Sequence, residues 1–307
     1  MATAASPGML KEALAGPHAK EWAAANEDEI NMLKCLGTWK LVPCPKDSLV
    51  IPTHPILRVK TSSDGEILCR KVRWVAGGHC QTKGVNFDET FAAAAKISSI
   101  CMVLALASWD WEIDHLDVVG AYLNAKLDED IYMEVPQGVL TKEDGDIVAK
   151  LLNGMYGLKQ SGRVWHRKLT GIFSELGFQW SATDHSMFYC LRGEERLLIP
   201  VSTDDMVVAR NSWEAVDQFK SELAWQLEIT DLGEIQWLLG FEVRQQRSVH
   251  TISINQSAYI KSIASCFQLL DSKPIHTPID PRTILDVSQC PDEAITHPYR
   301  EACGSVL

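Results

Sequence analysis

Two adjacent carboxylates, Asp204 and Asp205, are the residues of this chain with the clearest capacity for chemistry. They lie within an apolar run, 197–209, that indicates two short strands, so the pair falls at the bend of a predicted hairpin. Like charges side by side repel, and a protein that keeps both ionised usually supplies a cation, most simply a divalent metal with oxygen ligands. An isolated Asp-Asp pair is more often an ordinary turn in a solvated hairpin. Other residues must therefore decide between these interpretations.

A third carboxylate, Asp117, ends a predicted central strand at 111–118. Strand ends of one sheet can lie side by side whatever the length of the intervening chain, so Asp117 and Asp204 can share two Mg²⁺ ions. Two such ions are what phosphoryl transfer needs, one to lower the pKa of an attacking hydroxyl and one to stabilise the leaving phosphate oxygens. The carboxylates by themselves fit a polymerase or a two-metal nuclease.

Composition places the chain among globular proteins. Its 307 residues, 46% hydrophobic and 22% charged, suffice for a large core and roughly two domains. No apolar stretch reaches the ~20 residues of a membrane span, and the N-terminus lacks the regions of a signal peptide. The nine cysteines are scattered singly, which argues against a disulfide scaffold and a zinc ribbon. We expect an intracellular protein with reduced thiols and no membrane partner.

The charge of the chain is unevenly distributed. A net charge of -11 has the wrong sign for a general nucleic-acid binder. However, 46–84 carries seven basic residues against three acidic ones, and 151–170 carries four basic residues and no acidic one. Each basic island is either a solvated face or a place where nucleic acid is held.

The hydrophobic pattern predicts an α+β fold, because helices and antiparallel strands alternate without a parallel βαβ rhythm. Ile67 to Ala76 alternates apolar and basic residues, which predicts one strand of a twisted, cation-bearing hairpin with a turn at 63–65. Ile97 to Trp109 is apolar almost all round, which predicts a buried helix. Further helices are predicted at 21–36, 163–176, 213–227 and from 256, and further strands at 38–42, 56–60, 237–246 and 249–254.

Blocks of this sequence, in the right order, resemble those of copia-type LTR retrotransposon reverse transcriptases. The first block is 117–124 (Asp-Val-Val-Gly-Ala-Tyr-Leu-Asn) followed by 131–138. The second is 156–160 with Arg163 and Trp165, and the third is 204–206, which matches the core of the family's Tyr-Val-Asp-Asp box. Shorter matches occur at 38–39, 71–76, 89–92, 184–185, 231–233, 239–240 and Tyr259. The resemblance extends from about Glu12 to Leu307.

This resemblance implies a right-hand polymerase, with an antiparallel palm sheet packed on helices. Residues 12–270 would form the reverse transcriptase, with fingers at about 38–96, palm at about 97–245 and the start of the thumb at about 246–270. Residues 271–307 would form a linker and the start of a connection segment, truncated before ribonuclease H. The implied activity is RNA-directed DNA polymerisation by a Pol polyprotein domain, in the cytoplasm or in retroelement particles. Its cofactor would be Mg²⁺, with Mn²⁺ as a substitute, and its partners an RNA template, a DNA primer and dNTPs.

The resemblance also assigns roles at the catalytic centre. Asp117 and Asp204 would ligate the catalytic metals, with Asp205 beside them. Tyr122 would lie under the incoming sugar as a steric gate against a 2′-hydroxyl, and Ala121 would leave it room.

Other roles carried over by position concern the substrates. Four residues would bind nucleic acid: Lys159 and Arg163 at the template-primer backbone, and Leu239 and Gly240 at the primer end. Three would bind the nucleotide: Lys71 and Arg73 by gripping its triphosphate, and Gln160 by packing near it. Trp165 is expected to serve core packing, and 231–233 to form a turn.

The sequence departs from the family pattern next to the aspartate pair. Ser202 and Thr203 replace the usual Tyr-Val, and Pro200 falls inside the preceding strand. A proline in mid-strand removes a ladder donor, which predicts a distorted catalytic hairpin. Two alternatives to a polymerase therefore stay open: a catalytically inactive remnant that binds nucleic acid or protein, and a two-metal nuclease.

Overall fold

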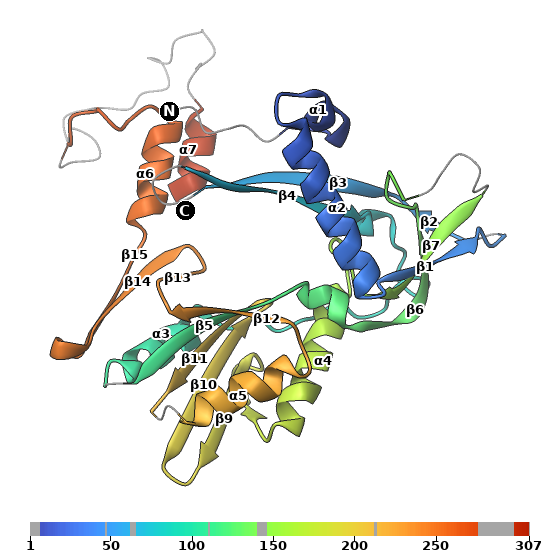
Figure 1. The fold of residues 1–307 in the computed structure, drawn as a ribbon. Helices are drawn as coiled ribbons and strands as arrows, with labels where there is room; N and C mark the ends of the chain where they lie inside the picture. Colours follow the sequence, from blue (N-terminus) through green and yellow to red (C-terminus); the bar gives the residue numbers. More distant parts are fainter. Residues whose placement is uncertain are drawn as a thin grey trace, which may run out of the picture. The chain divides into compact units, whose positions relative to one another are not determined.

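The computed structural model describes residues 7–46, 48–61, 66–109, 111–139, 146–211, 214–275 and 298–306 (Figure 1). The chain divides into two units, the first comprising Met1–Ile235 with Gln245–Ile252 and the second Gln236–Arg244 with Ser253–Leu307. Within the described ranges, no helix combines the length and apolar character needed to cross a membrane. The first unit contains most of the sequence blocks that suggested chemistry.

The first unit contains a two-stranded hairpin with helices packed on one side of it. Strands β3 (Thr53–Thr61) and β4 (Ile67–Ala76) pair antiparallel from Thr53 opposite Ala76 onward, as the alternating pattern predicted. Helix α2 (Ala19–Cys35) packs along β4, and α1 (Leu10–Ala15) packs on α2. Trp22, Leu33 and Trp74 are buried between the helix and the hairpin. The predicted turn at 63–65 lies outside the described residues.

A small sheet extends this part of the fold, in the order β1 (Trp39–Pro43), β7 (Ile147–Asn153), β6 (Lys126–Met133) and β2 (Val50–Ile51). Its β2–β6 pair is parallel, and the other two pairs are antiparallel. Ile51, Ile131 and Leu151 join the core shared with the hairpin and α2. The hairpin therefore has a buried base.

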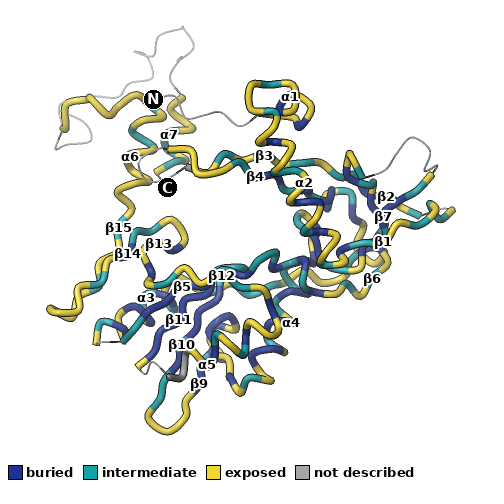
Figure 2. Tube along the Cα trace, in the orientation of Figure 1, coloured by how far each residue is buried: buried dark blue, intermediate teal, exposed yellow. Residues whose placement is uncertain are grey.

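The central sheet of the first unit has six strands in the order β12-β5-β11-β10-β9-β8, and all its pairs are antiparallel. The bounds are Ile229–Glu234, Glu112–Val118, Asp205–Arg210, Glu195–Ser202, Met187–Arg192 and Gln179–Trp180 in that order. Figure 2 shows its inner strands as buried along much of their length. Central strands covered on both faces lose the simple alternation of a half-exposed strand, which explains the continuous apolar run before Ser202.

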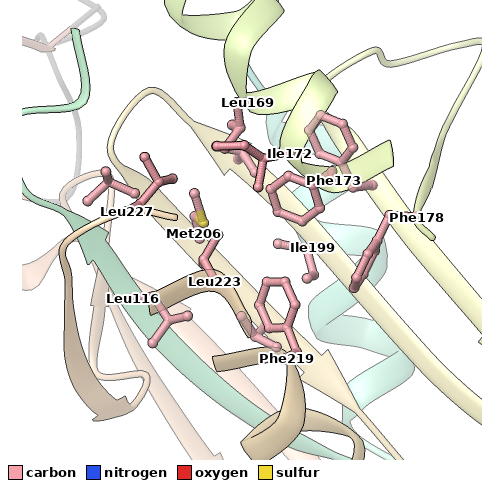
Figure 3. Close-up of a cluster of buried hydrophobic side chains, with 14 of the residues drawn as sticks. Leu116, Leu169, Ile172, Phe173, Phe178, Ile199, Met206, Phe219, Leu223 and Leu227 are labelled. Atoms are coloured by element: carbon pink, nitrogen blue, oxygen red, sulfur yellow. The ribbon is translucent and has the colours of Figure 1, made fainter. Parts of the chain in front are cut away.

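Helices α4 (Ser161–Glu175) and α5 (Glu214–Ala224) contribute to one large core with this sheet (Figure 3). Phe173 of α4 stacks on Phe188 of β9 with ring centroids 4.4 Å apart, and it meets Phe178 edge-on at 5.1 Å. Aromatic pairs of this kind stabilise a core beyond the area they bury. These aromatic contacts therefore hold α4 against the central sheet.

Helix α3 (Ile97–Ala107) differs from the prediction of a fully buried helix. It packs against β10 and β11, where Ile100, Val103 and Leu104 are buried. The other face of the helix is open, with Ile97, Met102 and Leu106 all classed as exposed. The predicted burial is wrong because the sheet covers only one side of an α-helix, however apolar the helix is.

The second unit includes strand β13 (Trp237–Leu238) and most of strands β14 (Phe241–Gln246) and β15 (Thr251–Asn255), which form a three-stranded sheet. Helices α6 (Ser257–Cys266) and α7 (Tyr299–Val306) follow, and the hydroxyl of Tyr259 donates to the carbonyl of Ser305 at 2.9 Å. The strand predicted at 249–254 and the helix predicted from 256 are present, whereas a turn at Leu239-Gly240 divides the strand predicted at 237–246 into β13 and β14. Most of the predicted linker, 276–297, lies outside the described residues.

Two glycines allow the base of the hairpin to contact the loop before α4. A Cβ on Gly157 would lie 2.2 Å from the carbonyl oxygen of Ala76, and one on Gly78 would lie 2.0 Å from the carbonyl oxygen of Gly157. Gly157 also has a φ of +91°, in the region that only glycine adopts freely. The amide of Ala76 donates to the carbonyl of Tyr156 at 2.8 Å. This backbone contact fixes the hairpin to the loop.

Replacing Gly157 with alanine should therefore destabilise the protein by roughly 2–4 kcal/mol, because left-handed strain and a steric overlap add. The matched control is Gly171→Ala. Gly171 is exposed on α4 with open space around it, so alanine there should stabilise by about 1 kcal/mol. Urea denaturation of both variants checks the prediction, and equal effects at the two glycines would contradict it.

Candidate active site

Three carboxylates lie at one end of the central sheet. Strands β5 and β11 pair with Asp205 opposite Asp117, and Ser202 pairs with Asp205 across the β10–β11 hairpin, so Thr203 and Asp204 form its bend. The amide of Val118 donates to the carbonyl of Asp204 at 2.9 Å, which ties this bend to the end of β5. The structure thus brings together the carboxylates singled out from sequence.

The carboxylates perturb one another. Burial raises the pKa of Asp117, and the charges of Asp204 and Asp205 raise that pKa further. Lys71 and His115 oppose this effect with positive charge. The raised pKa of Asp117 therefore reflects its burial and its repulsion by the two neighbouring carboxylates.

His115 was not predicted from the sequence. Its Nε2 lies 2.9 Å from Oδ1 of Asp205, and its side chain is 12% exposed. His115 stands two residues before Asp117 on β5, so both side chains point to the same face of the sheet. The two-residue spacing of His115 and Asp117 on a strand could therefore have identified His115 as a partner of the aspartate pair.

The donor set fits a hard divalent cation. Residues directly opposite on antiparallel strands have side chains within about 5 Å at Cβ, so the carboxylates of Asp117 and Asp205 can reach a shared ion. In the part of the chain that the structure describes, no three His, Cys, Asp or Glu side chains are already arranged around a single metal position. The arrangement supplies oxygen ligands and a surplus of negative charge.

The bend of the β10–β11 hairpin is strained. Thr203 has a φ of +61°, a left-handed conformation that is unfavourable for a β-branched residue. The indole Nε1 of Trp165 on α4 donates to the carbonyl of Thr203 at 2.7 Å. Trp165 is buried as predicted, but it also anchors the bend, a role that core packing alone did not indicate.

The distortion predicted from Pro200 is absent from the register. Leu198 is opposite Ala209 before the proline, and Val201 is opposite Met206 after it, which is the same register. On the other side, Pro200 itself pairs with Met187 of β9. The pairing of β10 with β11 is interrupted at Ile199 and Pro200 and resumes at Val201 without a shift, so the predicted distortion does not extend to the register.

The alternation of β4 divides its cations between two faces. Arg70 faces α2, where it forms an ion pair with Glu21 and lies 5.9 Å from the centre of the Trp22 ring. Lys71 and Arg73 project from the opposite face of the strand. The family-derived pair of cations is therefore separated from Arg70, which has a partner of its own.

Lys71 and Arg73 belong to the electrostatic surroundings of the carboxylates. Burial lowers the pKa of Lys71, as do the charges of Arg73 and Lys60, whereas Glu29 and Asp117 act to raise it. The Nε of Arg73 is buried and has no hydrogen-bond partner among the described residues. A buried donor without an acceptor is costly, and a bound anion would satisfy it.

Tyr122 and Ala121 follow β5 in a short 3₁₀ helix, η2 (Ala121–Asn124). Ala121 is buried and Tyr122 is half-buried, with its ring 5.8 Å from that of Tyr156 in an edge-to-face arrangement. The Tyr122 side chain also lines a cavity of about 190 Å³ with Trp165 and Thr203. Tyr122 therefore adjoins both the loop before α4 and the catalytic bend.

Gln160 has mainly structural contacts. It is 1% exposed, its Nε2 donates to the carbonyl of Asn86 at 2.7 Å, and its Oε1 accepts from Gln81 at 3.0 Å. Lys159 is exposed, and its Nζ donates to the carbonyl of Gln81 while lying 4.6 Å from the centre of the Phe87 ring. A nucleotide contact by Gln160 stays a prediction, since its amide already has protein partners.

A groove of about 360 Å³ runs along the outer side of α4. It combines cations with exposed aromatic rings, and it is lined by Phe91, Ala93, Arg163, His166, Arg167, Thr170, Trp180 and His185. Arg163 also forms an ion pair with Glu89 at its edge. Positive charge beside aromatic faces is the combination that binds single-stranded nucleic acid.

Leu239 and Gly240 form the turn between β13 and β14, with φ values of +49° and +83°. They belong to the second unit. Their contact with a primer end stays a prediction.

A family model described as reverse transcriptase (RNA-dependent DNA polymerase) matches residues 36–281 of this chain. The chain belongs to the reverse transcriptase family. The fold class inferred from the sequence blocks is confirmed, with antiparallel sheets packed on helices, consistent with a polymerase fingers and palm fold. The exact boundaries between fingers, palm and thumb stay predictions.

Named relatives agree with this assignment. The chain is 30% identical over 309 residues to the retrovirus-related Pol polyprotein from transposon TNT 1-94 of Nicotiana tabacum, with 98% of this chain and 23% of the relative covered. It is 31% identical to the corresponding polyprotein from transposon RE1 of Arabidopsis thaliana, with 94% and 20% covered. The resemblance to copia-type reverse transcriptases is confirmed, and the chain spans about a fifth of the length of these relatives.

One solved structure that is similar to the chain is a foamy viral protease-reverse transcriptase in complex with double-stranded DNA. It is 13% identical to the chain, with a TM-score of 0.45, and the match covers 78% of this chain and 36% of that one.

The anchor of the catalytic bend can be tested by substitution. Trp165→Phe removes the indole N–H bonded to the Thr203 carbonyl together with part of a buried ring, so it should destabilise the protein by about 2–3 kcal/mol. Thr203→Gly relieves the left-handed strain and should stabilise by up to about 1 kcal/mol. Trp225→Phe, at a fully solvated tryptophan, is the neutral control. Thermal denaturation measures all three, and a neutral Trp165→Phe would refute the anchoring role.

The repulsion at the sheet end predicts a pH dependence. Since the pKa of Asp117 in the fold exceeds its usual 3.8, the folded protein keeps a proton that the unfolded chain has lost in the interval between the two values. The contribution of Asp117 to stability therefore falls as pH rises through that interval. Asp117→Asn should flatten this dependence and raise the Tm at neutral pH, and Mg²⁺ should raise the Tm of the wild type more than that of the variant.

Asp231 provides a control of opposite sign. Burial acts to raise its pKa, but hydrogen bonds from Lys220 and from the amide of Gly233 hold that pKa below the usual value. Asp231→Asn should therefore lower stability, with a contribution lost as pH falls. Parallel Tm-against-pH curves for the wild type and Asp117→Asn would show that the carboxylates do not repel as described.

Proposed function

We propose that this domain is an RNA-directed DNA polymerase that adds dNTPs to a primer 3′-hydroxyl. The supporting observation is the combination of three carboxylates at the end of β5 and β11 with the cations Lys71 and Arg73 on the site-facing side of β4. Nucleotidyl transfer needs both signs of charge, since metal ions hold the reacting oxygens and basic groups hold the triphosphate. If the basic residues of β4 formed only a solvated face and the aspartate pair only a turn, neither the cations nor the carboxylates would need to be gathered there.

Asp117, Asp204 and Asp205 would hold Mg²⁺, or Mn²⁺ in its place. Bound there, the metal would lower the pKa of the primer 3′-hydroxyl and stabilise charge on the phosphate oxygens. The Asp205 carboxylate accepts a hydrogen bond from Nε2 of His115, so His115 orients that carboxylate. The Trp165 anchor on Thr203 and the Val118 bond to Asp204 fix the backbone from which the ligands project.

Lys71 and Arg73 bind the triphosphate in this proposal. Arg73 brings a buried Nε that has no acceptor among the described residues, and Lys71 has a lowered pKa because it is buried beside another cation. An anion relieves both conditions at once, by accepting from the guanidinium and by stabilising the charged ammonium. Tyr122 then lies beside the sugar and restricts its 2′ position, with the small side chain of Ala121 beneath.

The template would follow the basic and aromatic groove of α4. Arg163 and Arg167 contact phosphates, and the exposed rings of Phe91 and Trp180 stack on unpaired bases. Exposed Lys159 adds a contact to the template-primer backbone, and Leu239-Gly240 contacts the primer end. Because phosphate contacts dominate in an acidic protein, affinity should weaken steeply with salt. The setting of this activity would be intracellular, in the cytoplasm or in retroelement particles.

A primer-extension assay tests the proposal. On a primed homopolymer RNA with Mg²⁺ or Mn²⁺, the wild type should incorporate dNTPs, and Asp204→Asn should lower the rate about a hundredfold or more. Lys71→Ala should lower kcat/KM about tenfold to a hundredfold through loss of a charged contact to the nucleotide. Asp217→Asn, an exposed acid on α5, is the matched control and should be neutral.

The same assay separates the alternatives. Cleavage of the labelled strand that requires Asp204 would indicate a two-metal nuclease. Salt-sensitive binding of the primed template without extension or cleavage would indicate an inactive remnant. Either outcome would overturn the polymerase proposal.

A further inference from the structure

Tyr156 lies between two residues with different proposed tasks. The guanidinium carbon of Arg73 is 5.1 Å from the centre of the Tyr156 ring, and the Tyr122 ring meets the same ring at 5.8 Å with an interplanar angle of 67°. These contacts join β4, η2 and the loop before α4 through one side chain. No role at the site has so far been given to Tyr156.

The ring of Tyr156 is held firmly. The backbone carbonyl of Tyr156 accepts a hydrogen bond from the amide of Ala76. The next residue, Gly157, packs so closely against the Ala76 carbonyl that a Cβ there would overlap it. Burial raises the pKa of the Tyr156 hydroxyl to about 12, so the phenol stays neutral at physiological pH. Arg73 therefore rests on a fixed, uncharged aromatic face.

We propose that Tyr156 is a positioning residue that couples Arg73 to Tyr122, so that one ring controls both dNTP affinity and discrimination against a 2′-hydroxyl. This inference rests on the proposed polymerase function and extends it to the specificity of the nucleotide site. Tyr156 contacts the groups that would bind the nucleotide without itself being assigned a contact to it.

The physical basis is the restriction of two side chains. An arginine side chain has many rotamers, and stacking on an aromatic face selects those that keep the guanidinium over the ring, with a gain of about 1 kcal/mol. An edge-to-face contact similarly fixes the tilt of the Tyr122 ring. Loss of the Tyr156 ring would let Arg73 leave the triphosphate and let Tyr122 rotate away from the sugar.

A neighbouring pair provides a matched control. Lys150 lies 5.7 Å from the centre of the Tyr132 ring on the small β1–β7–β6–β2 sheet. This is the same kind of cation–aromatic contact, also at a half-buried tyrosine, but neither residue contacts the proposed nucleotide-binding groups in the described contacts. Tyr132→Leu therefore measures the structural cost of losing such a ring.

The experiment compares Tyr156→Phe, Tyr156→Leu and Tyr132→Leu in steady-state primer extension with dNTPs and rNTPs. Tyr156→Leu should raise KM for dNTP about fivefold to tenfold with little change in kcat, and lower selectivity for dNTP over rNTP by a similar factor. Tyr156→Phe keeps the ring but loses the side-chain hydrogen bond between the hydroxyl and Arg73, so it should change both properties less than Tyr156→Leu does. Tyr132→Leu should change neither KM nor selectivity.

A double variant tests the coupling to Arg73. If the ring acts by holding Arg73, then Arg73→Ala combined with Tyr156→Leu should raise KM no more than Arg73→Ala alone. Additive effects would overturn the coupling. A Tyr156→Leu variant that matches Tyr132→Leu in KM and selectivity would reduce Tyr156 to a packing residue.

Failure of the polymerase proposal can be told apart from failure of this inference. Binding of dNTP and rNTP to the protein on a dideoxy-terminated primer-template requires no chemistry, so the same variants can be compared by Kd. If the wild type binds nucleotide but does not extend the primer, the polymerase proposal is overturned. The ratios of Kd for dNTP and rNTP among the variants would still decide the role of Tyr156. A wild type that binds no nucleotide would overturn both.

Discussion

The register between β5 and β11 is the constraint on which the site depends. It sets Asp205 opposite Asp117 and leaves Asp204 in a two-residue bend, so three carboxylates occupy one sheet end. Like charges directly opposite on neighbouring strands destabilise a sheet. The register persists because a one-residue slip would turn buried Met206 and Val208 away from the core formed with α4 and α5. The hydrophobic core therefore holds in place an arrangement that electrostatics opposes.

The cationic side of the site follows from strand alternation on the hairpin. One face of β4 carries Arg70 and Trp74 against α2, where the amide of Trp74 donates to buried Glu29 and the indole donates to Asn26. The opposite face carries Lys71 and Arg73. Because α2 holds one face and the glycine contact at Gly157 holds the hairpin base, the opposite face has a defined direction. An acidic chain can in this way concentrate positive charge where it is needed.

Local pattern was enough to predict the parts of the fold that local pattern controls. The alternation in 67–76, the periodicity in 21–36 and the apolar run around the aspartates each predicted the correct element, and strand ends in a shared sheet predicted the meeting of Asp117 with Asp204. Contacts between distant segments were not predictable in this way. The indole of Trp165 on Thr203 and the ring of Tyr156 under Arg73 join residues whose separations carry no periodic signal. The open face of α3 and the unchanged register across Pro200 were missed for a related reason, since neighbouring elements decide both outcomes.

The two charged sides of the site do not satisfy each other. Asp117 has a raised pKa and Lys71 a lowered one, although each carries charge that favours the ionised form of the other. Burial is the largest contribution in both cases, and like charge is the next: Asp204 and Asp205 beside Asp117, and Arg73 beside Lys71. A ligand that relieves both sides must present positive charge to the carboxylates and negative charge to the hairpin. A divalent metal bound to a nucleoside triphosphate has this distribution of charge, whereas a free metal or a free anion would satisfy only one side. The electrostatics of the two sides thus favour the proposed substrate complex over either of its components.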